Sequence, residues 1–416
     1  MRDNPEFSSG LIEPLDTASA ALEGVLDVLP GAQEHVEVSA IIPCLNEERT
    51  LGICIEKIQR AFASAGIRGE IVVGDNGSSD ASIEIAMRMG ARVAHQPVKG
   101  YGAALQAAAN AARGRYLVMA DADDSYDWSD IPRFVAVLRE GADLVMGDRF
   151  AGGIEAGAMP ALHRYFGNPV LSAIGRVAHA TPVRDFHCGM RGFTREAYRR
   201  IAARSPGMEF ASEMVINAQR AGLAIAEVPI RLYPDKRDRR PHLRSFRDGW
   251  RHLRLIVAHA PDRLYLAPGL ALMLAGLVGL GVLARGPVTI AGQYFGIHWV
   301  ALSTMATLIG LSAILLGTLA KVAIATYQPL SRGQLVPWLL RTRPVEALIA
   351  TGAGLAGLGI LADGWLALHW LLVGGGMEAS VHLAFILTTA CVAGVTMVLA
   401  GFVLKLLLDN LSYRDA

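Results

Sequence analysis

Two aspartates, Asp121 and Asp123, follow a run of apolar residues in the segment RYLVMADADD, which spans residues 115–124. A short apolar run of this kind is typical of a buried β-strand. Side chains at positions i and i+2 of a strand point to the same side. The two carboxylates could therefore bind one hard cation, such as the Mg²⁺ or Mn²⁺ that accompanies a diphosphate. For such a pair taken alone, an acidic turn after a strand is the alternative interpretation.

The aspartates belong to a region in which predicted strands and helices alternate. Apolar runs predict strands at 38–43, 70–74, 92–95, 116–120 and 143–147. Apolar residues at helical spacing predict helices at 51–62, 79–89, 101–112 and 131–139. This alternation predicts an α/β fold with a Rossmann-like, mostly parallel sheet.

Polar side chains follow all five predicted strands, at the ends where ligands bind in parallel sheets. They are Asn46 and Glu47, Asp75 and Asn76, Lys99, Asp121 with Asp123, and Asp148 with Arg149. Because parallel strands end at a common edge of the sheet, we expect these side chains to form one site.

Two of these strand ends suit different parts of a nucleotide. Asp75 could accept a hydrogen bond from a base or a ribose, or it could cap the helix that follows. The segment KGYG, from Lys99 to Gly102, opens a helix, so its amides and ammonium group suit a phosphate; an ordinary loop-to-helix junction is the alternative. The same glycines partly imitate a dinucleotide fingerprint, but Leu105 stands where the third glycine belongs, which disfavours a nicotinamide-dependent enzyme.

Composition separates a charged first part of the chain from an apolar second part. The 416 residues suffice for two or three domains, and a net charge of +1 gives no reason to expect nucleic-acid binding. Four scattered cysteines without C-x-x-C spacing argue against a zinc site and suit free thiols. We expect a flexible arm at 1–37, a catalytic domain at 38–235, a basic segment at 236–263 and an all-α transmembrane domain of four helices at 264–408.

Four stretches of the second part are apolar and long enough to cross a bilayer, at about 264–284, 297–320, 345–363 and 381–408. The middle loop carries Arg332, Arg341 and Arg343, whereas the other two loops carry only Arg285. The positive-inside rule then places the middle loop, the catalytic domain and the C-terminus in the cytoplasm, for a multi-pass protein of the plasma (inner) membrane. Asp363 is expected near an interface.

Five motifs in order carry a family resemblance: IIPCLNEE (41–48), VVGDNGSSD (72–80), KGYGAAL (99–105), DADD (121–124) and GDRF (147–150). They resemble those of the inverting family 2 glycosyltransferases, and more narrowly the branch of dolichol-phosphate mannose synthase and polyprenyl-phosphate glucosyltransferases. The resemblance covers about 38–260. It implies a GT-A fold, a nucleotide-sugar donor and a divalent metal, Mg²⁺ or Mn²⁺. The Q-x-x-R-W signature of processive synthases is absent, which argues for a single transfer.

The resemblance also suggests which residues form the site. The nucleotide-sugar site is expected to comprise Pro43, Leu45, Asn46, Glu47, Asp75, Asn76, Lys99, Gly100 and Ala122. The metal is assigned to Asp121 and Asp123, and the acceptor phosphate to Arg149 and Arg164. Asp123, Asp124 and Asp185 are the candidates for orienting the acceptor, and the sequence does not choose among them.

Two positions depart from the family pattern. The segment DFHCGMRGF (185–193) resembles the D-x-x-S-G-F-R stretch of the branch, with Cys188 in place of the serine. Ser125 stands where family members often have a glutamine, two residues after the second aspartate of the motif.

The basic segment between the domains offers further sites for phosphate. It could be the charged flank of a membrane span, or a helix lying on an anionic leaflet. The resemblance adds a loop that closes over both substrates. Guanidinium groups bind phosphate in bidentate fashion, so Arg237, Arg239 and Arg240 are candidates for contacting a lipid phosphate or a diphosphate.

The sequence therefore predicts a membrane glycosyltransferase that moves one hexose from a nucleotide-sugar, of the UDP-glucose or GDP-mannose type, to polyprenyl phosphate with inversion. Transfer to another lipid or to a lipid-linked sugar is one alternative. A membrane-tethered nucleotide-sugar-binding module without turnover is another.

Overall fold

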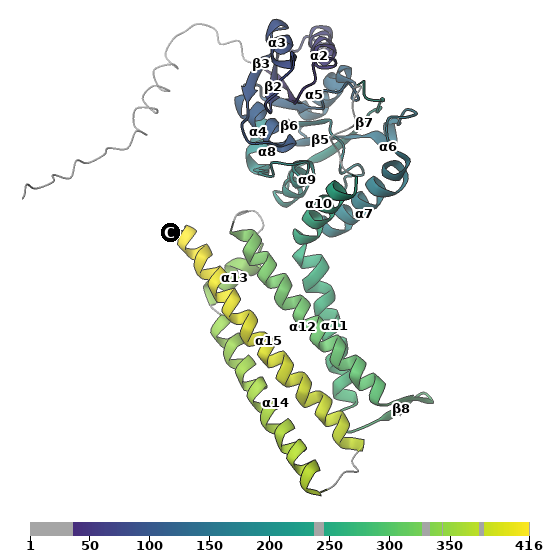
Figure 1. The fold of residues 1–416 in the computed structure, drawn as a ribbon, viewed down its shortest axis with the longest axis vertical. Helices are drawn as coiled ribbons and strands as arrows, with labels where there is room; N and C mark the ends of the chain where they lie inside the picture. The colour runs from purple at the N-terminus through teal and green to yellow at the C-terminus, as the bar shows by residue number, and fades with distance from the viewer. Residues whose placement is uncertain (1–35, 237–244, 327–332, 343, 374–377, 416) are drawn as a thin grey trace, which may run out of the picture.

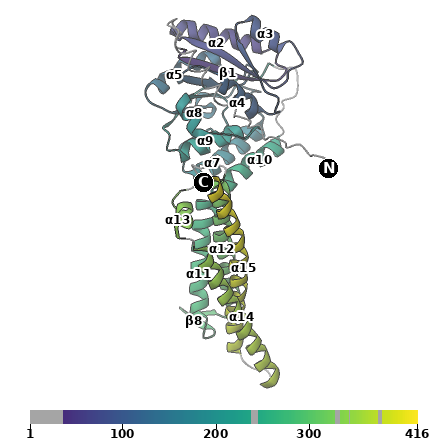
Figure 2. The ribbon, with the colours of Figure 1, turned by 90° about the vertical axis from the view of Figure 1, so that its left-hand side faces the viewer.

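The computed structural model describes residues 36–236, 245–326, 333–342, 344–373 and 378–415. An α/β domain comes first, and a bundle of long helices extends away from it (Figure 1). Helices α7 (Asn168–His179) and α10 (Ser245–Ala258) lie where the two parts meet, and a view turned by 90° shows the same arrangement (Figure 2). The expected arm lies almost entirely outside the described residues.

The α/β domain is built on a seven-stranded sheet with the order β3-β2-β1-β4-β6-β5-β7. Its strands are β1 (Val38–Cys44), β2 (Gly69–Asp75), β3 (Arg92–His95), β4 (Tyr116–Met119), β5 (Leu144–Asp148), β6 (Arg191–Thr194) and β7 (Ile225–Pro229). Strand β6 runs antiparallel to its neighbours β4 and β5, while the other pairings are parallel. The predicted mostly parallel sheet is confirmed, with its five predicted strands in place.

The sequence analysis did not predict β6 and β7. Both are short, and their residues break the apolar pattern that marks the other strands. Arg191 and Gly192 stand in β6, and Glu227 and Pro229 stand in β7.

Helices cover both faces of the sheet. They are α2 (Leu51–Ala65), α3 (Ser82–Arg88), α4 (Tyr101–Ala111), α5 (Ile131–Arg139), α6 (Arg149–Gly152), α8 (Arg195–Ile201) and α9 (Phe210–Arg220), besides α7 and α10. Successive residues of one strand enter opposite cores: Ile42 packs with α2, α3 and α5, whereas Ile41 packs with α4, α8 and α9. Strands buried on both faces read as continuous apolar runs, which explains why the pattern predicted them.

The chain changes direction across the sheet between β1 and β4. From β1 it adds β2 and β3 on one side, and β4 then pairs with the other side of β1. Ligands of open α/β sheets bind outside the carboxyl ends of the strands at such a switch point. Asn46 and Glu47 follow β1 there, and Asp121 and Asp123 follow β4.

Among the described residues, four helices are long and apolar enough to cross a membrane: Asp262–Val282, Ile297–Ala325, Val345–Leu372 and Val381–Tyr413. They belong to the π-turn η3 (Asp262–Leu266) with α11 (Ala267–Val282), and to α12 (Ile297–Ala325), α14 (Val345–Val373) and α15 (Glu378–Asp415). A short helix α13 (Leu335–Thr342) and a hairpin of β8 (Val288–Ile290) and β9 (Gln293–Phe295) complete this part. The sequence analysis predicted an entirely helical domain, and this hairpin is the exception to it.

The third long helix does not end at residue 363 as predicted. It continues to Val373, because the apolar pattern resumes after Asp363. The Asp363 carboxylate accepts a hydrogen bond from Thr388 Oγ1 at 3.0 Å, so it has a polar partner on the neighbouring helix α15.

Glycines let α11 and α12 approach closely. A methyl group on Gly276 would lie 2.4 Å from Thr307 Oγ1, and one on Gly279 would lie 2.2 Å from Ser303 Oγ. Close backbone approach through small residues is a common way for membrane helices to associate.

Gly74, in the VVGDN motif, provides a test of the packing beneath the catalytic edge. A Cβ atom there would lie 2.1 Å from the Ala104 carbonyl oxygen of α4. We expect Gly74→Ala to lower the free energy of unfolding by about 1–3 kcal/mol, because α4 must move away from the sheet. Gly52→Ala is the control, since its Cβ would meet atoms at an ordinary 3.5 Å. Thermal unfolding of the purified chain in detergent measures both; equal midpoints would contradict the packing argument.

Candidate active site

The DADD motif forms a turn rather than the end of a strand. Strand β4 ends at Met119, two residues before Asp121, so the expected alternation of side chains along a strand does not apply to Asp121 and Asp123. The turn closes at Asp124, whose φ of +60° lies in the left-handed region. Aspartate adopts that region more readily than most residues. The orientation of the carboxylates therefore depends on their individual partners.

Asp123 is oriented by the residue two positions later. Its Oδ1 accepts hydrogen bonds from the Ser125 amide at 3.0 Å and from Ser125 Oγ at 2.6 Å, and both residues are buried. Ser125 thus supports Asp123 from the position where family members often have glutamine.

Asp121 lies against two residues that the sequence analysis did not select. A Cβ atom on Gly189 would lie 3.0 Å from Asp121 Oδ2, so only glycine leaves this carboxylate its space. Burial, followed by the charge of Asp121 and a hydrogen bond to it, raises the pKa of Tyr101 well above its ordinary value. The Tyr101 hydroxyl therefore stays protonated and donates to Asp121. Tyr101 belongs to the KGYG motif, and this was the sequence feature that could have identified it.

These two carboxylates fit a divalent cation that also binds a diphosphate. Within the described residues, no group of three or more His, Cys, Asp or Glu side chains could hold a metal by itself. Mg²⁺ commonly binds through one or two carboxylates together with substrate phosphates. Asp121 and Asp123 offer carboxylate oxygens, the hard ligands that such a cation prefers.

Asp124 has a different environment from the other two aspartates. Its side chain is fully buried and contacts two ammonium groups, Lys57 Nζ at 2.7 Å and Lys236 Nζ at 2.6 Å. Burial lowers the pKa of Lys57, but the hydrogen bond and charge of Asp124 outweigh it and raise that pKa. Asp124 thereby connects α2 with the segment that leads towards the membrane. The structure gives it a positioning role, and its assignment to the acceptor stays a prediction.

Asp75 ends β2 and organises the turn that follows. Its carboxylate accepts from the amides of Gly77 and Ser78, each at 3.0 Å, and lies 3.4 Å from His95 Nδ1. Burial raises the pKa of Asp75, but hydrogen bonds from Ser78, Gly77 and His95 outweigh it and hold that pKa below the ordinary value. Asp75 is therefore an ionised acceptor that holds the turn after β2, and its role in binding a base or a ribose stays a prediction.

Asn76 holds the loop between β3 and α4. Its amide nitrogen donates to the carbonyls of Gln96 and Val98, and its oxygen accepts from the Gly100 amide at 2.7 Å. Lys99 Nζ donates to the main-chain carbonyl of Asn76 at 2.6 Å.

The first turn of α4 packs against segment 205–207. The Ala103 amide donates to the Pro206 carbonyl at 3.0 Å, and Gly100 adopts a φ of +146°. A Cβ atom on Gly100 would lie 2.1 Å from the Pro206 carbonyl oxygen. Two amides of this junction, those of Gly100 and Ala103, are thus bound within the protein. The phosphate role of Lys99 and Gly100 stays a prediction.

The loop after β1 is tied to the loop after β2. Asn46 has a φ of +58°, and its Oδ1 accepts from the Ser79 amide at 2.7 Å. The Glu47 amide donates to Ser82 Oγ at 2.8 Å, and Glu47 is buried. Pro43 and Leu45 flank this loop, and the Ala122 carbonyl contacts Cys54 Sγ of α2 at 3.5 Å. The predicted nucleotide residues therefore lie together at the β1, β2 and β4 ends of the sheet.

Arg149 and Asp185, named separately from the sequence, form one buried ion pair. Arg149 Nε lies 2.6 Å from Asp185 Oδ2, and Arg149 Nη2 lies 2.7 Å from Asp185 Oδ1. Burial lowers the pKa of Arg149, but Asp185 outweighs it and raises that pKa well above its ordinary value. The side chain of Arg149 is 8% exposed and that of Asp185 is fully buried. This bidentate pair fixes the start of α6 to segment 185–191.

Arg191 is a second buried guanidinium that the sequence analysis missed. It donates to the carbonyls of Cys188 at 2.9 Å, Phe186 at 3.2 Å and Ala211. It thereby holds the segment containing Gly189 against Asp121. Arg191 is the arginine of the DFHCGMR stretch, and this was the sequence feature that could have identified it.

Arg164 lies apart from this network. It is part of the π-turn η2 (His163–Gly167), next to α7, and its guanidinium lies 5.5 Å from the ring centre of Tyr165. Tyr165 and Phe166 beside it are exposed. Arg237, Arg239 and Arg240 lie outside the described residues.

Comparison with known proteins agrees with this arrangement. Residues 39–202 match the model of glycosyl transferase family 2, and residues 318–408 match the family 2 C-terminal transmembrane region. A hexosyltransferase of low-salt glycan biosynthesis, Agl6 of Haloferax volcanii, is 37% identical over 368 residues, which are 88% of this chain and 88% of that protein. The chain belongs to glycosyltransferase family 2. It is a membrane glycosyltransferase.

Further similarities concern the catalytic domain. A dolichyl-phosphate hexose transferase of Haloferax volcanii is 35% identical over 195 residues, which are 47% of this chain and 82% of that protein. A solved glucosyl-3-phosphoglycerate synthase from Mycobacterium tuberculosis, with Mn²⁺, UDP and glucosyl-3-phosphoglycerate bound, is 25% identical. The match covers 55% of this chain and 80% of that chain, with a TM-score of 0.42.

The buried pair of Arg149 and Asp185 makes a stability prediction. We expect Asp185→Ala to lower the free energy of unfolding by about 3–5 kcal/mol, because it leaves a buried guanidinium without its carboxylate. Glu155→Ala is the matched control, since the ion pair of Glu155 with Arg231 is exposed and should contribute less than about 1 kcal/mol. Thermal unfolding in detergent measures both variants; similar small shifts would show that the buried pair does not hold this region.

Proposed function

We propose that this glycosyltransferase moves one hexose from a nucleotide-sugar, of the UDP-glucose or GDP-mannose type, to polyprenyl phosphate with inversion. The observation that carries the proposal is the direct connection between the DADD turn and the chain leading to the membrane helices. The Tyr233 amide donates to the Ser125 carbonyl at 2.9 Å, and Lys236 pairs with Asp124. These contacts support the proposal, because they join the proposed donor site to the segment that leads to the membrane helices, where a lipid acceptor would approach.

In the proposed reaction an oxygen of the acceptor phosphate attacks the anomeric carbon, and the nucleoside diphosphate leaves from the opposite face. Asp75 and the loop after β1 bind the nucleoside, while Asp121 and Asp123 would hold a divalent metal, Mg²⁺ or Mn²⁺. When bound, such a metal neutralises charge on the leaving diphosphate. The acceptor phosphate is already anionic near neutral pH, so the transfer does not require a strong general base. This fits the burial of Asp185, whose carboxylate is paired with Arg149 and is therefore a poor candidate for a general base.

The proposed orientation places the α/β domain and the C-terminus in the cytoplasm of a cell bounded by the plasma (inner) membrane. Its support is the excess of arginine in the middle loop over the two other loops. The even number of candidate spans keeps the two ends of the membrane domain on one side.

The direct test incubates membranes containing the protein with Mg²⁺ or Mn²⁺ and a panel of radiolabelled nucleotide-sugars, followed by lipid extraction. Label in a mild-acid-labile lipid supports transfer to polyprenyl phosphate. Label in a different lipid or a lipid-linked sugar would favour the alternative acceptor. Tight nucleotide-sugar binding without any labelled lipid would favour a binding module.

We expect Asp121→Asn and Asp123→Asn each to abolish transfer while thermal unfolding stays near that of the wild type. Each change removes a proposed metal ligand at a turn and keeps the shape of the side chain. Asp130→Asn is the control, because Asp130 pairs with Arg133 away from the strand ends. Near-normal transfer by the Asp121 variant at saturating metal would overturn the assignment of the motif.

Arg164 tests the acceptor site more cleanly than Arg149, because Arg149 also holds a buried ion pair. We expect Arg164→Ala to lower kcat/KM for polyprenyl phosphate by about ten- to a hundredfold, as for the loss of one charge-assisted contact worth about 1.5–3 kcal/mol. Nucleotide-sugar binding, measured by calorimetry, should stay unchanged. Arg176→Ala, in the following helix, is the matched control. An equal loss of donor affinity would assign Arg164 to the diphosphate, and the search would move to Arg237, Arg239 and Arg240.

A further inference from the structure

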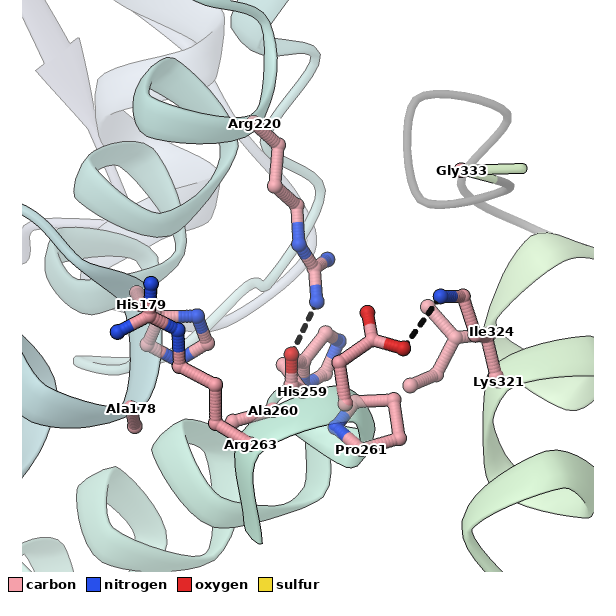
Figure 3. Close-up of a pocket in the computed structure, with 11 residues that line it drawn as sticks. Ala178, His179, Arg220, His259, Ala260, Pro261, Arg263, Lys321, Ile324 and Gly333 are labelled. Atoms are coloured by element: carbon pink, nitrogen blue, oxygen red, sulfur yellow. Dashed lines mark hydrogen bonds and ion pairs between the residues drawn. The ribbon is translucent and has the colours of Figure 1, made fainter. Parts of the chain in front are cut away.

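A cavity of about 240 Å³ lies between the α/β domain and the first two membrane helices (Figure 3). Its walls come from α7, from the end of α9, from the segment joining α10 to η3, and from the end of α12. None of the strand-end residues of the active site lines it. The volume is several times the roughly 30 Å³ that one water molecule occupies, so a phosphate group fits.

The cavity wall carries more positive than negative charge. Arg220 of α9, Arg263 of η3 and Lys321 of α12 line it, and Asp262 is the one carboxylate among the described residues of the lining. Lys321 Nζ pairs with Asp262 Oδ1 at 2.5 Å. The two guanidinium groups donate to main-chain carbonyls, Arg220 to His259 and Arg263 to Val177 at 3.3 Å. Carbonyl groups bind a guanidinium without neutralising its charge. Among the described residues that line the cavity, three cationic side chains therefore stand against one carboxylate.

The pKa values of two histidines in the cavity wall are lowered by burial and by the nearby positive charge. Burial, the charge of Arg220 and smaller effects of His259 and Arg263 lower the pKa of His179 to about 4, although its hydrogen bond to the Ile256 carbonyl opposes the shift. Burial and Arg220 also lower the pKa of His259. Both histidines are therefore neutral near neutral pH, and the cationic groups of the cavity are the arginines and the lysine.

The cavity lies at the level where the membrane helices begin. Asp262 and Arg263 start the first candidate span, and Lys321 and Ile324 lie in the last residues of the second. In a bilayer, the ends of spans meet the layer of lipid headgroups. A phosphate at this depth would be within reach of Arg263, which is exposed, and of Lys321, whose side chain is 9% exposed.

We propose that this cavity binds the phosphate of a membrane lipid headgroup, at a site separate from the active site. The ligand chemistry is an anionic phosphate held by charge-assisted hydrogen bonds from Arg220, Arg263 and Lys321. Its function is to fix the α/β domain to the headgroup layer, because the three cations come from both parts of the protein. The same chemistry would suit free inorganic phosphate, and the lipid is preferred here because the cavity opens where the spans end.

The test uses the full chain in nanodiscs of phosphatidylcholine, to which phosphatidylglycerol is added, with bound lipid counted by native mass spectrometry. We expect phosphatidylglycerol to bind the wild type about tenfold more tightly than phosphatidylcholine. Arg263→Gln and Arg220→Gln should each remove most of this preference, and Arg263→Lys should retain most of it, because the charge is kept. Arg285→Gln is the matched control, since Arg285 lies just beyond the opposite end of α11.

Three results would overturn the proposal. One is an unchanged preference for phosphatidylglycerol in Arg263→Gln. The thermal midpoint of this variant serves as the check that any loss of the preference does not come from misfolding. A second is an equal loss in Arg285→Gln, which would show general attraction of basic residues to the bilayer. The third is displacement of the lipid by inorganic phosphate at comparable concentration, which would identify a site for free phosphate.

Discussion

A buried carboxylate needs compensating charge, and at Asp124 that need determines how the catalytic turn is held. Two ammonium groups supply the compensation, from Lys57 on α2 and from Lys236 at the start of the chain towards the membrane. Removing either partner would leave charge poorly compensated inside the protein, which is costly. In the same turn, whose last residue Asp124 has a left-handed backbone, Asp123 contacts Ser125 and Asp121 lies against Gly189. The proposed sites for metal, donor and acceptor all involve this turn.

The same principle recurs next to it in a different form. Arg149 is compensated by Asp185 through two short hydrogen bonds, whereas Arg191 is surrounded by carbonyl groups. One guanidinium therefore fixes the carboxyl end of β5, and the other fixes the segment that borders Asp121. These contacts hold the DFHCGMR stretch close to the DADD motif in space, although the two are far apart in sequence.

Strand positions could be predicted because five strands are buried on both faces and read as apolar runs. Strands β6 and β7 were missed, since Arg191 and Glu227 break that pattern for reasons that only tertiary contacts reveal. The types of residue at the site were also predictable, but their pairing was not. Asp124 contacts Lys57 and Lys236, which are 67 and 112 residues away in the sequence, and no local pattern predicts either contact. Alternation along a strand was the wrong basis for the DADD pair, because the strand ends before it.

The close contact between α11 and α12 has a consequence beyond the bundle itself. At Gly276 the hydroxyl of Thr307 occupies the space of a side chain, and at Gly279 Ser303 does so. Helices that interlock in this way cannot slide along each other without a clash. Helix α11 continues through η3 to the α/β domain, and Lys321 of α12 grips Asp262 at the same level. The membrane domain therefore fixes the distance between the candidate spans and the edge of the sheet that carries the proposed site. For the proposed reaction, that distance would determine which part of a lipid acceptor is within reach of the site.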